Sequence, residues 1–370
     1  MGEIERKPAI RFAGFTEAWE QCELSNKVNF FTGLTYSPSN VTNEYGSLVL
    51  RSSNVKNGEI VLEDNVYVES DIVNSENVQE GDIIVVVRNG SRDLIGKHAQ
   101  IKHKMLNTVI GAFMTGVRYK EPEFLNALLN TEQFNQEIEK NLGATINQIT
   151  TGNFKKMQFN FPESYVEQNK IGEFFLNIDN LITLHQRKFE ALSNIKKALL
   201  EKMFPANGEF TPKIRFAGFT EAWEQCELKD IYTFKYGEFN NNPDNGGKYP
   251  IYGANGIIGG YDRFNTENSI IIGHMGEYAG SVIYEKNKHF VTYNGTITTK
   301  KDKTPVKYYD FSLLSSIGIN KICNSSGLPF LSYDKLNEIK IHTSNNQLEK
   351  DKLGAILESV DNLITLHQRE

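Results

Sequence analysis

A segment near the N-terminus recurs unchanged in the middle of the chain, and this repeat constrains the fold more than any other feature. Ile10–Leu24 (IRFAGFTEAWEQCEL) returns as Ile214–Leu228, and a second element, Asp179–Arg187 (DNLITLHQR), returns as Asp361–Arg369. We call these elements frame A and frame B, and the divergent segments between them module X (first) and module Y (second). The period is too long for a solenoid or propeller unit, so it indicates a tandem domain duplication.

Length and composition are those of a globular protein. A chain of 370 residues, 39% hydrophobic and 23% charged, is large enough for two or three domains with their own cores. Cys22 and Cys226 are copies of one another within frame A, so we expect small scaffold residues and no disulfide framework. No apolar run is long enough to span a membrane and no apolar signal core is visible, so we expect no membrane association and a cytoplasmic location.

Frame B lies within a segment that predicts a long helix, because Tyr165 to Phe204 contains no proline. Apolar residues recur there at steps of three and four, with His185 filling one gap. Such a stripe is about 60 Å long, more than one module covers, so we expect the two B helices to pair antiparallel as a coiled coil. His185 and its copy His367 are expected to pack or to set the register. The stripe comprises Ile171, Phe175, Ile178, Ile182, Phe189, Leu192, Ile195, Leu199 and Met203.

The second helix stops at Glu370, so it has no counterpart for the last part of the first helix. We therefore expect Ile195, Leu199 and Met203 to form an exposed apolar strip that a partner protein or a second copy of the chain covers. The predicted fold class is α+β, with two β-rich modules separated by the paired helices. The expected boundaries are 1–162 for the first module, 163–205 for the central helix, 206–345 for the second module and 346–370 for the shorter C-terminal helix.

The modules share an outline of strands and loops despite their different sequences. In module X the apolar strand Ile83–Val87 runs into a glycine-bearing polar loop from Arg88, and in module Y Ser269–Ile272 runs into Gly273–Gly280. We also expect Gly111 to correspond to Gly295. Each module closes with a polar, glycine-bearing segment that starts at Gly143 or Ser325. Strands at corresponding positions that carry loops of different sequence predict a variable binding surface.

Charge permits a nucleic-acid surface on each module. The net charge of −6 argues against binding by the whole surface, but basic residues cluster between Ile84 and Lys120 and between Lys286 and Lys307. A solvated lysine-rich face remains the alternative explanation. Arginine and asparagine recognise base edges and lysine neutralises phosphate, so we predict DNA contacts from the loop residues. These candidates are Arg88, Asn89, Arg92, Lys97 and His98 in module X, and His274, Tyr278, Asn294 and Lys300 in module Y.

The sequence contains no recognisable catalytic motif. It lacks a GxxxxGK[ST] phosphate loop, a GxSxG elbow, an HExxH pair and a histidine or cysteine ligand cluster, so we predict no catalytic residue and no metal site. Two alternatives to DNA recognition stay open at this point. One is an enzyme with a cleft in each module, for which Asp93 and Glu277 are the best candidate carboxylates. The other is a helical adaptor that binds only proteins.

The arrangement of frames and modules resembles the specificity subunits of type I restriction-modification enzymes, over essentially the whole chain. The most specific strings are frame A in both copies, Asn177–Pro205 and Tyr249–Tyr261 (YPIYGANGIIGGY). The resemblance implies two target recognition domains, each contacting one half of a bipartite site in double-stranded DNA, with the helices setting the spacing. The absence of residues after Glu370 departs from the family, whose members usually complete the second helix.

The same resemblance implies that catalysis belongs to partner proteins. Two modification subunits would methylate adenine from S-adenosylmethionine, and restriction subunits would translocate and cut DNA using ATP and Mg. The chain itself would hold no cofactor. Two equivalent copies of frame B would seat two copies of the modification subunit. The residues expected to dock these partners are Ile178, Ile182, Leu192, Leu199 and Ile364.

Overall fold

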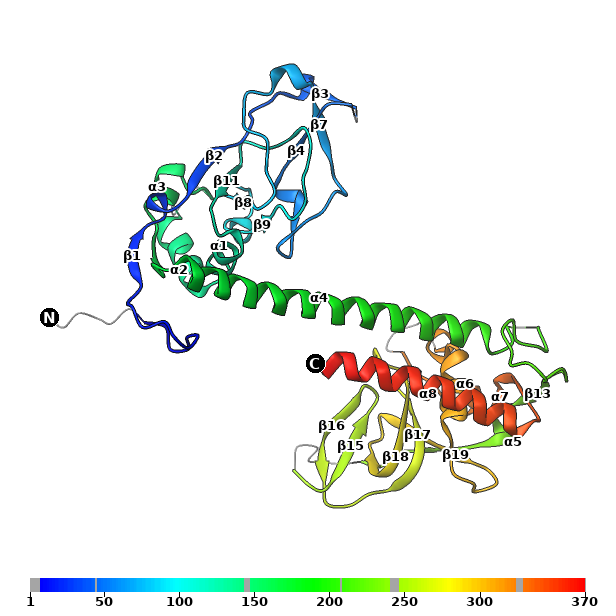
Figure 1. Cartoon of the computed structure of the whole chain (residues 1–370). Coiled ribbons are helices and arrows are strands. Elements are labelled where there is room, and N and C mark those ends of the chain that lie inside the picture. The colour runs from blue at the N-terminus through cyan, green and yellow to red at the C-terminus, as the bar shows by residue number, and fades with distance from the viewer. Residues whose placement is uncertain are drawn as a thin grey trace. The chain divides into compact units, whose positions relative to one another are not determined.

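A computed structural model describes residues 7–43, 45–142, 147–206, 208–239, 246–323 and 329–369. It divides into two compact units, residues 1–182 and 183–370, whose boundary falls within the long helix α4 (Tyr165–Lys202). Unit 1 holds module X and unit 2 holds module Y (Figure 1). No helix among the described residues is both long and apolar enough to cross a membrane.

Unit 1 contains two separate four-stranded sheets, both formed by strands of module X. The first is antiparallel and has the order β2 (Asn29–Thr32), β11 (Met114–Arg118), β8 (Ile83–Val86), β9 (His98–Gln100). The second has the order β10 (Thr108–Ile110), β4 (Ser47–Leu50), β7 (Val66–Val68), β3 (Val41–Thr42), and its β10 and β4 are parallel. A small hairpin joins β5 (Val55–Lys56) and β6 (Glu59–Ile60). The helices are α1 (Pro122–Leu129), α2 (Glu132–Asn141) and α3 (Thr151–Lys156), with 3-10 turns η1 (Leu24–Asn26), η2 (Pro38–Asn40), η3 (Ser52–Asn54), η4 (Ser70–Ile72) and η5 (Arg92–Leu94).

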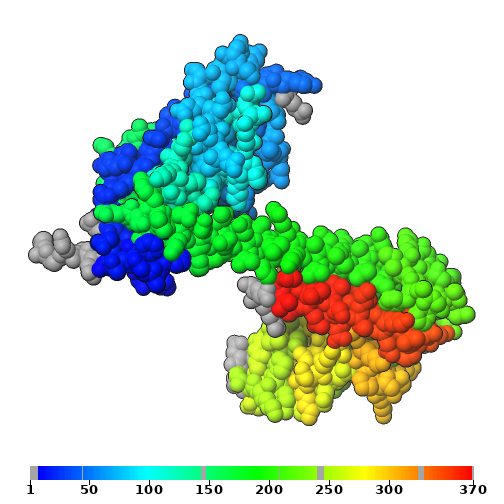
Figure 2. All heavy atoms as spheres, viewed as in Figure 1, coloured from blue at the N-terminus to red at the C-terminus, as the bar shows by residue number. Residues whose placement is uncertain are grey.

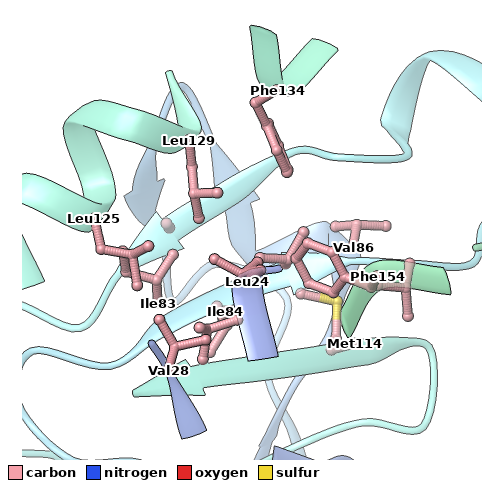
Figure 3. Close-up of a cluster of buried hydrophobic side chains, with 14 of the residues drawn as sticks. Leu24, Val28, Ile83, Ile84, Val86, Met114, Leu125, Leu129, Phe134 and Phe154 are labelled. Atoms are coloured by element: carbon pink, nitrogen blue, oxygen red, sulfur yellow. The ribbon is translucent and has the colours of Figure 1, made fainter. Parts of the chain in front are cut away.

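The core of unit 1 forms around β8, because its apolar run is covered on both faces. Ile83 and Ile84 are fully buried on consecutive positions, which point to opposite faces of the strand. Figure 3 shows Leu125 of α1 beside Ile83, and Leu129 of α1 and Phe154 of α3 belong to the same cluster of buried side chains. This packing makes the sheet a rigid support for the loops that leave its ends.

Unit 2 is built on one six-stranded sheet. Its order is β14 (Tyr232–Tyr236), β19 (Gly295–Lys300), β17 (Thr266–Gly273), β18 (Val282–Val291), β15 (Tyr249–Gly253), β16 (Gly256–Tyr261), and only β15 and β18 are parallel. The helices are α5 (Leu228–Ile231), α6 (Tyr308–Ser316), α7 (Tyr333–Glu338) and α8 (Gln347–Arg369), with the 3-10 turn η6 (Ile319–Ile322). Trp223, Tyr232 and Leu314 are buried in the core of this unit.

Each copy of frame A pairs with the strand that leads into the following frame B. In unit 1, β1 (Glu20–Glu23) is antiparallel to β12 (Gln158–Phe161), and in unit 2, β13 (Glu224–Glu227) is antiparallel to β20 (Lys340–Thr343). Cys22 faces Phe159 in the first pair, as its copy faces the equivalent strand residue in the second. Neither cysteine forms a disulfide, as expected. The two frames therefore close each module by bringing its ends together.

A buried ion pair and a close glycine contact complete this closure in both units. Arg11 Nε lies 2.6 Å from Glu167 Oε1 at the start of α4. Glycine is required where the same helix approaches α1, because a Cβ at Gly172 would lie 2.5 Å from the backbone nitrogen of Phe124. In unit 2 the ion pair and the glycine contact recur at the equivalent residues, Arg215–Glu349 and Gly354–Tyr309.

The C-terminal part of α4 lies antiparallel to α8 in unit 2. His185 Nδ1 is 3.1 Å from His367 Nδ1, whereas Lys196 Nζ is 2.7 Å from Asp361 Oδ1. Residue numbers rise along α4 as they fall along α8, so the expected antiparallel direction is confirmed. Figure 2 shows α8 in red packed along this part of α4 in green. The histidines are equivalent residues of the repeat, and their contact marks where the two B copies cross.

The expected exposed strip at the end of α4 is wrong. Met203 is only 3% exposed and belongs to the core of unit 2, and Leu199 packs against that core, whereas Ile195 is 49% exposed. The antiparallel direction explains the difference, because it places the end of α4 beside the start of α8, where Leu353 and Leu357 lie in the same core. Unit 2 itself therefore covers Leu199 and Met203.

Candidate nucleic-acid interface

Both modules hold the loop that follows the central strand with the same backbone hydrogen bonds. In module X, Val87 O accepts from Ile149 N at 2.8 Å, and in module Y, His274 O accepts from Leu331 N at 2.9 Å. The next residue on each strand forms an isolated antiparallel bridge, Arg88 with Gln148 and Met275 with Phe330. Val87 and His274 are therefore structurally equivalent. We call the end of each sheet at which they lie the loop end.

A second pair of segments is also equivalent at the loop end. Leu34 bridges Gly111 in parallel, and Glu238 bridges Thr292 in the same way. The residue before each bridge is a glycine, at positions 33 and 237, because a Cβ there would lie 2.0 or 2.1 Å from the carbonyl oxygen of Gly111 or Thr292. Gly111 thus corresponds to Thr292, and the expected match with Gly295 is wrong by three residues. Loops of different sequence leave no signal from which to fix that register.

Arg88 is the most available of the predicted arginines. It is exposed, and its guanidinium lies 4.9 Å from the centroid of the Phe113 ring. Arg92, by contrast, forms an exposed ion pair with Glu139 at 2.9 Å. Lys97 is also exposed, and no carboxylate among the described residues forms an ion pair with Arg88 or Lys97. The positive charges of Arg88 and Lys97 are therefore available to interact with a ligand.

Asn89 lies in a cleft at the loop end of module X. Its Nδ2 donates to Ser52 Oγ at 2.9 Å, and its Oδ1 accepts from Ser91 N at 3.0 Å, so its amide orientation is fixed. Arg51 also lines the cleft and donates from Nη2 to Asp64 Oδ2 at 2.7 Å. The cleft has a volume of about 720 Å³, and its lining also includes Leu34, Thr35, Tyr36, Ser53, Ala112 and Phe113.

Arg51 and Ser52 were not among the residues that sequence analysis selected. They follow the apolar strand β4 just as Arg88 and Asn89 follow β8, so the same pattern of a buried strand followed by polar residues could have found them. The cleft brings together loops that follow β4 and β8, which are far apart in the sequence. It offers hydroxyl, amide and guanidinium groups above an apolar lining, a combination that suits contacts with the edges and methyl groups of bases.

His98 and His274 are interior residues and do not face a ligand. His98 lies on β9, is 9% exposed, and its ring packs edge-on against Phe134. His274 is 6% exposed and donates from Nδ1 to Leu331 O at 2.8 Å. Burial lowers the pKa of both histidines, although a backbone hydrogen bond opposes the shift in each. Both are therefore neutral core residues near pH 7, and we remove them from the candidate DNA contacts.

Lys300 also lies away from the predicted surface. It is at the end of β19 opposite the loop end, and its Nζ is 3.3 Å from Asp310 Oδ2. Tyr278 is 44% exposed in the loop after β17, and Asn294 is half-buried beside His274, to whose backbone nitrogen it offers its carbonyl oxygen at 2.8 Å. Tyr278 and Asn294 therefore remain candidates.

The basic clusters are more fully paired than the sequence indicates. Arg118 binds the buried carboxylate of Asp82, with Nε 2.7 Å from Oδ1, and Lys102 pairs with Glu59 at 2.5 Å. These residues stabilise module X and leave a weaker positive field than a count of charges implies. Residues 143–146 and 325–328 of the two predicted closing segments lie outside the described residues.

The described residues include no group of three or more His, Cys, Asp or Glu side chains placed to hold a metal ion. Asp93 and Glu277, the carboxylates that an enzymatic function would use, are both exposed, and Asp93 does not line the cleft of module X. Among the described residues, Asp64 is the carboxylate that lines this cleft, and it is bound by Arg51.

Comparison with known proteins identifies the family. The profile described as type I restriction modification DNA specificity domain matches residues 16–194 and again 220–370. The specificity subunit of the type I restriction enzyme EcoKI from Escherichia coli (strain K12) is 23% identical over 258 residues, which are 66% of this chain and 55% of that protein. The MjaVIII specificity subunit of Methanocaldococcus jannaschii is 26% identical over 244 residues, 55% of each chain.

The chain thus spans about half the length of the curated relatives it matches. A solved structure shares its fold: the type I restriction-modification S subunit from M. genitalium superposes with a TM-score of 0.69 at 18% identity, covering 95% of this chain and 91% of that one. Because the two profile matches together cover most of the chain, the assignment does not depend on one module. The chain belongs to the family of type I restriction modification DNA specificity domains, and it carries two copies of that domain.

Proposed function

We propose that the chain is the DNA-recognition subunit of a type I restriction-modification complex, and that modules X and Y each recognise one half of a bipartite site in double-stranded DNA. One observation carries this proposal. The two loop ends have equivalent backbones on identical frames but different side chains, as at Val87 and His274. A common scaffold with different surface residues is what two independent half-sites require.

The helices offer two equivalent surfaces on which a partner could dock. Leu181 and Leu184 of α4 are 55% and 46% exposed, and their copies Leu363 and Leu366 on α8 are 46% and 49% exposed. Exposed leucines that recur at equivalent positions suit two copies of the same partner. In our proposal these partners are the modification subunits. Of the residues first expected to dock, Ile182 is 50% exposed, Ile178, Leu192 and Ile364 are half-buried, and Leu199 belongs to the core packing of unit 2.

Catalysis in this proposal belongs to the partners, which would use S-adenosylmethionine, ATP and Mg, while the chain holds no cofactor. The enzymatic alternative has less support, because Arg51 binds Asp64, the carboxylate that lines the cleft of module X in the part of the chain that the structure describes. The purely structural adaptor has less support because it gives no role to the differences between the loop ends.

Selection of binding sites tests the proposal directly. The chain, assembled with modification subunits, is incubated with random DNA duplexes at several salt concentrations, and the bound duplexes are sequenced. We expect a motif of two short specific elements separated by an unspecified spacer. The chain alone, given labelled S-adenosylmethionine and DNA, should transfer no methyl group. Binding without sequence preference, or methyl transfer by the chain alone, would contradict the proposal.

A further inference from the structure

Two aromatic side chains project from the loop end of module Y. Phe239 follows β14 and Tyr293 lies between β18 and β19, and these residues are 67% and 45% exposed. Their ring centroids are 5.8 Å apart with planes inclined by 34°, so they form a pair. Large aromatic side chains gain stability by burial, and these two forgo much of that gain. Packing of the fold therefore does not account for the pair.

The duplication provides an internal comparison for these positions. Because Leu34 is equivalent to Glu238 and Gly111 to Thr292, the residues that follow them, Thr35 and Ala112, are the counterparts of Phe239 and Tyr293. Both small residues line the cleft of module X. The same backbone arrangement thus supports an open cleft in one module and a projecting aromatic pair in the other. The frame does not require aromatic residues at these positions.

A protein partner shared by both modules does not explain the pair. Such a partner would contact residues that occur twice, as Leu181 and Leu363 do, whereas the aromatic pair occurs once. What differs between the two modules under the proposed function is the half-site that each one contacts. The aromatic pair therefore belongs with DNA recognition and not with docking of a shared subunit.

The charges next to the pair do not favour a phosphate contact. Glu238, which precedes Phe239, lies 3.6 Å from Arg263 Nη2 and 3.9 Å from Lys235 Nζ, and its carboxylate partly neutralises both. Aromatic rings instead contact DNA through base faces, by stacking on a base or by entering a base step and partly unstacking it. The bases, and not the backbone, are therefore the chemical groups that suit this pair.

We propose that Phe239 and Tyr293 form an apolar wedge that contacts and partly unstacks bases in the half-site of module Y, where module X instead has an open cleft lined by the small residues Thr35 and Ala112. The inference rests on the proposed function, since it assigns a mode of contact to one of its two half-sites. It makes base stacking, and not hydrogen bonding alone, part of how module Y selects its sequence. It also predicts that the two half-sites respond differently to aromatic substitution.

The test exchanges the pair for the residues of module X. The double variant Phe239→Thr/Tyr293→Ala is assembled with the modification subunits, and its affinity is measured for the selected duplex and for duplexes altered in one half-site. We expect affinity to fall about 5- to 150-fold for each stacked ring, with an unchanged dependence on salt, because no phosphate contact is removed. 2-Aminopurine placed in the module Y half-site should brighten on binding the wild type but not the variant.

Matched variants separate this effect from misfolding. Phe264→Thr removes a ring that is 41% exposed at the opposite end of β17, and it should leave affinity unchanged. Tyr293→Phe keeps the ring and should also bind normally. The proposal is overturned if the double variant of a sequence-specific complex keeps wild-type affinity, or if Phe264→Thr causes the same loss. A wild-type complex without any sequence preference would instead refute the proposed function.

Discussion

Arg215 donates to both carboxylate oxygens of Glu349, from Nε at 2.6 Å and from Nη2 at 3.0 Å. The carboxylate is fully buried, and Ser344 Oγ also donates to it at 2.6 Å. Arg215 comes from frame A and Glu349 from the start of the helix that carries frame B, so the pair joins the two ends of module Y. The same contact recurs between Arg11 and Glu167, so each copy of frame A joins the two ends of its own module.

Removing one partner of this ion pair should strongly destabilise unit 2. Arg215→Met leaves the carboxylate of Glu349 buried without its counter-charge, which costs about 3 to 5 kcal/mol. Arg92→Met is the control, since the exposed pair with Glu139 contributes about 1 kcal/mol or less. Chemical denaturation measures both free energies of unfolding. Equal effects of the two substitutions would show that Arg215 does not hold the module closed.

The same contact predicts a dependence of stability on acid pH. Burial raises the pKa of Glu349, but hydrogen bonds from Arg215 and Ser344 outweigh it, so the pKa lies below the ordinary 4.5. A depressed pKa stabilises the fold at pH values above 4.5, and the contribution is lost as pH falls through the folded-state pKa. The melting temperature should therefore fall as the pH is lowered below 4.5, and it should fall less steeply for the Glu349→Gln variant. Parallel curves for variant and wild type would exclude Glu349 as the source.

Leu199→Lys should destabilise the protein and Ile195→Lys should not, although the two residues lie one helical turn apart on α4. Leu199→Lys places an ammonium group against the core of unit 2. It should lower the free energy of unfolding by at least the value of burying one leucine side chain, which is about 1.5 to 3 kcal/mol. Ile195→Lys, at a position that is 49% exposed, should change stability by about 0.5 kcal/mol or less. Sedimentation and thermal melting of both variants check this. A stable Leu199→Lys protein would show that the residue is not part of the core.

Arg88→Ala should weaken DNA binding by about 1 to 3 kcal/mol and relax the preference at one base position, because Arg88 is exposed and forms no ion pair with a carboxylate among the described residues, so its guanidinium can bind guanine. Arg92→Ala, whose side chain is paired with Glu139, should have a smaller effect. Affinities measured at several salt concentrations distinguish base from phosphate contacts. A uniform loss with a flatter salt dependence would make Arg88 a phosphate contact, and unchanged affinity would remove it from the interface.

Most of the architecture could be predicted from the sequence, because the same pattern of frames occurs in both halves of the chain. Identical frames around different modules indicated a shared scaffold, and the apolar stripe through His185 indicated a helix that needs a partner. The prediction that Met203 is exposed was wrong, although the antiparallel direction of the helix pair was predicted correctly. In an antiparallel pair, the end of α4 meets the start of α8, and the end of α8 lies beside His185.

The site could be predicted less well, because composition does not show which way a side chain points. His98 and Lys97 are neighbours of similar chemistry, but β9 begins at His98 and all its residues are buried. Phe239 and Tyr293 were missed because they are far apart in the sequence and join only at the loop end. Comparing Phe239 with Thr35, its equivalent in the frame A register, would have been the one available signal.

Exchange of one module tests the central claim most directly. Residues Leu24 to Phe161 are replaced by the first module of another family member, so that β1 of this chain is left to pair with the incoming strand in place of β12. The modified DNA of a strain that expresses the complex is then sequenced for methylated adenines. We expect one half of the bipartite site to change and the other half, with module Y unaltered, to stay the same. A change in both halves, or in neither, would contradict independent recognition by the two modules.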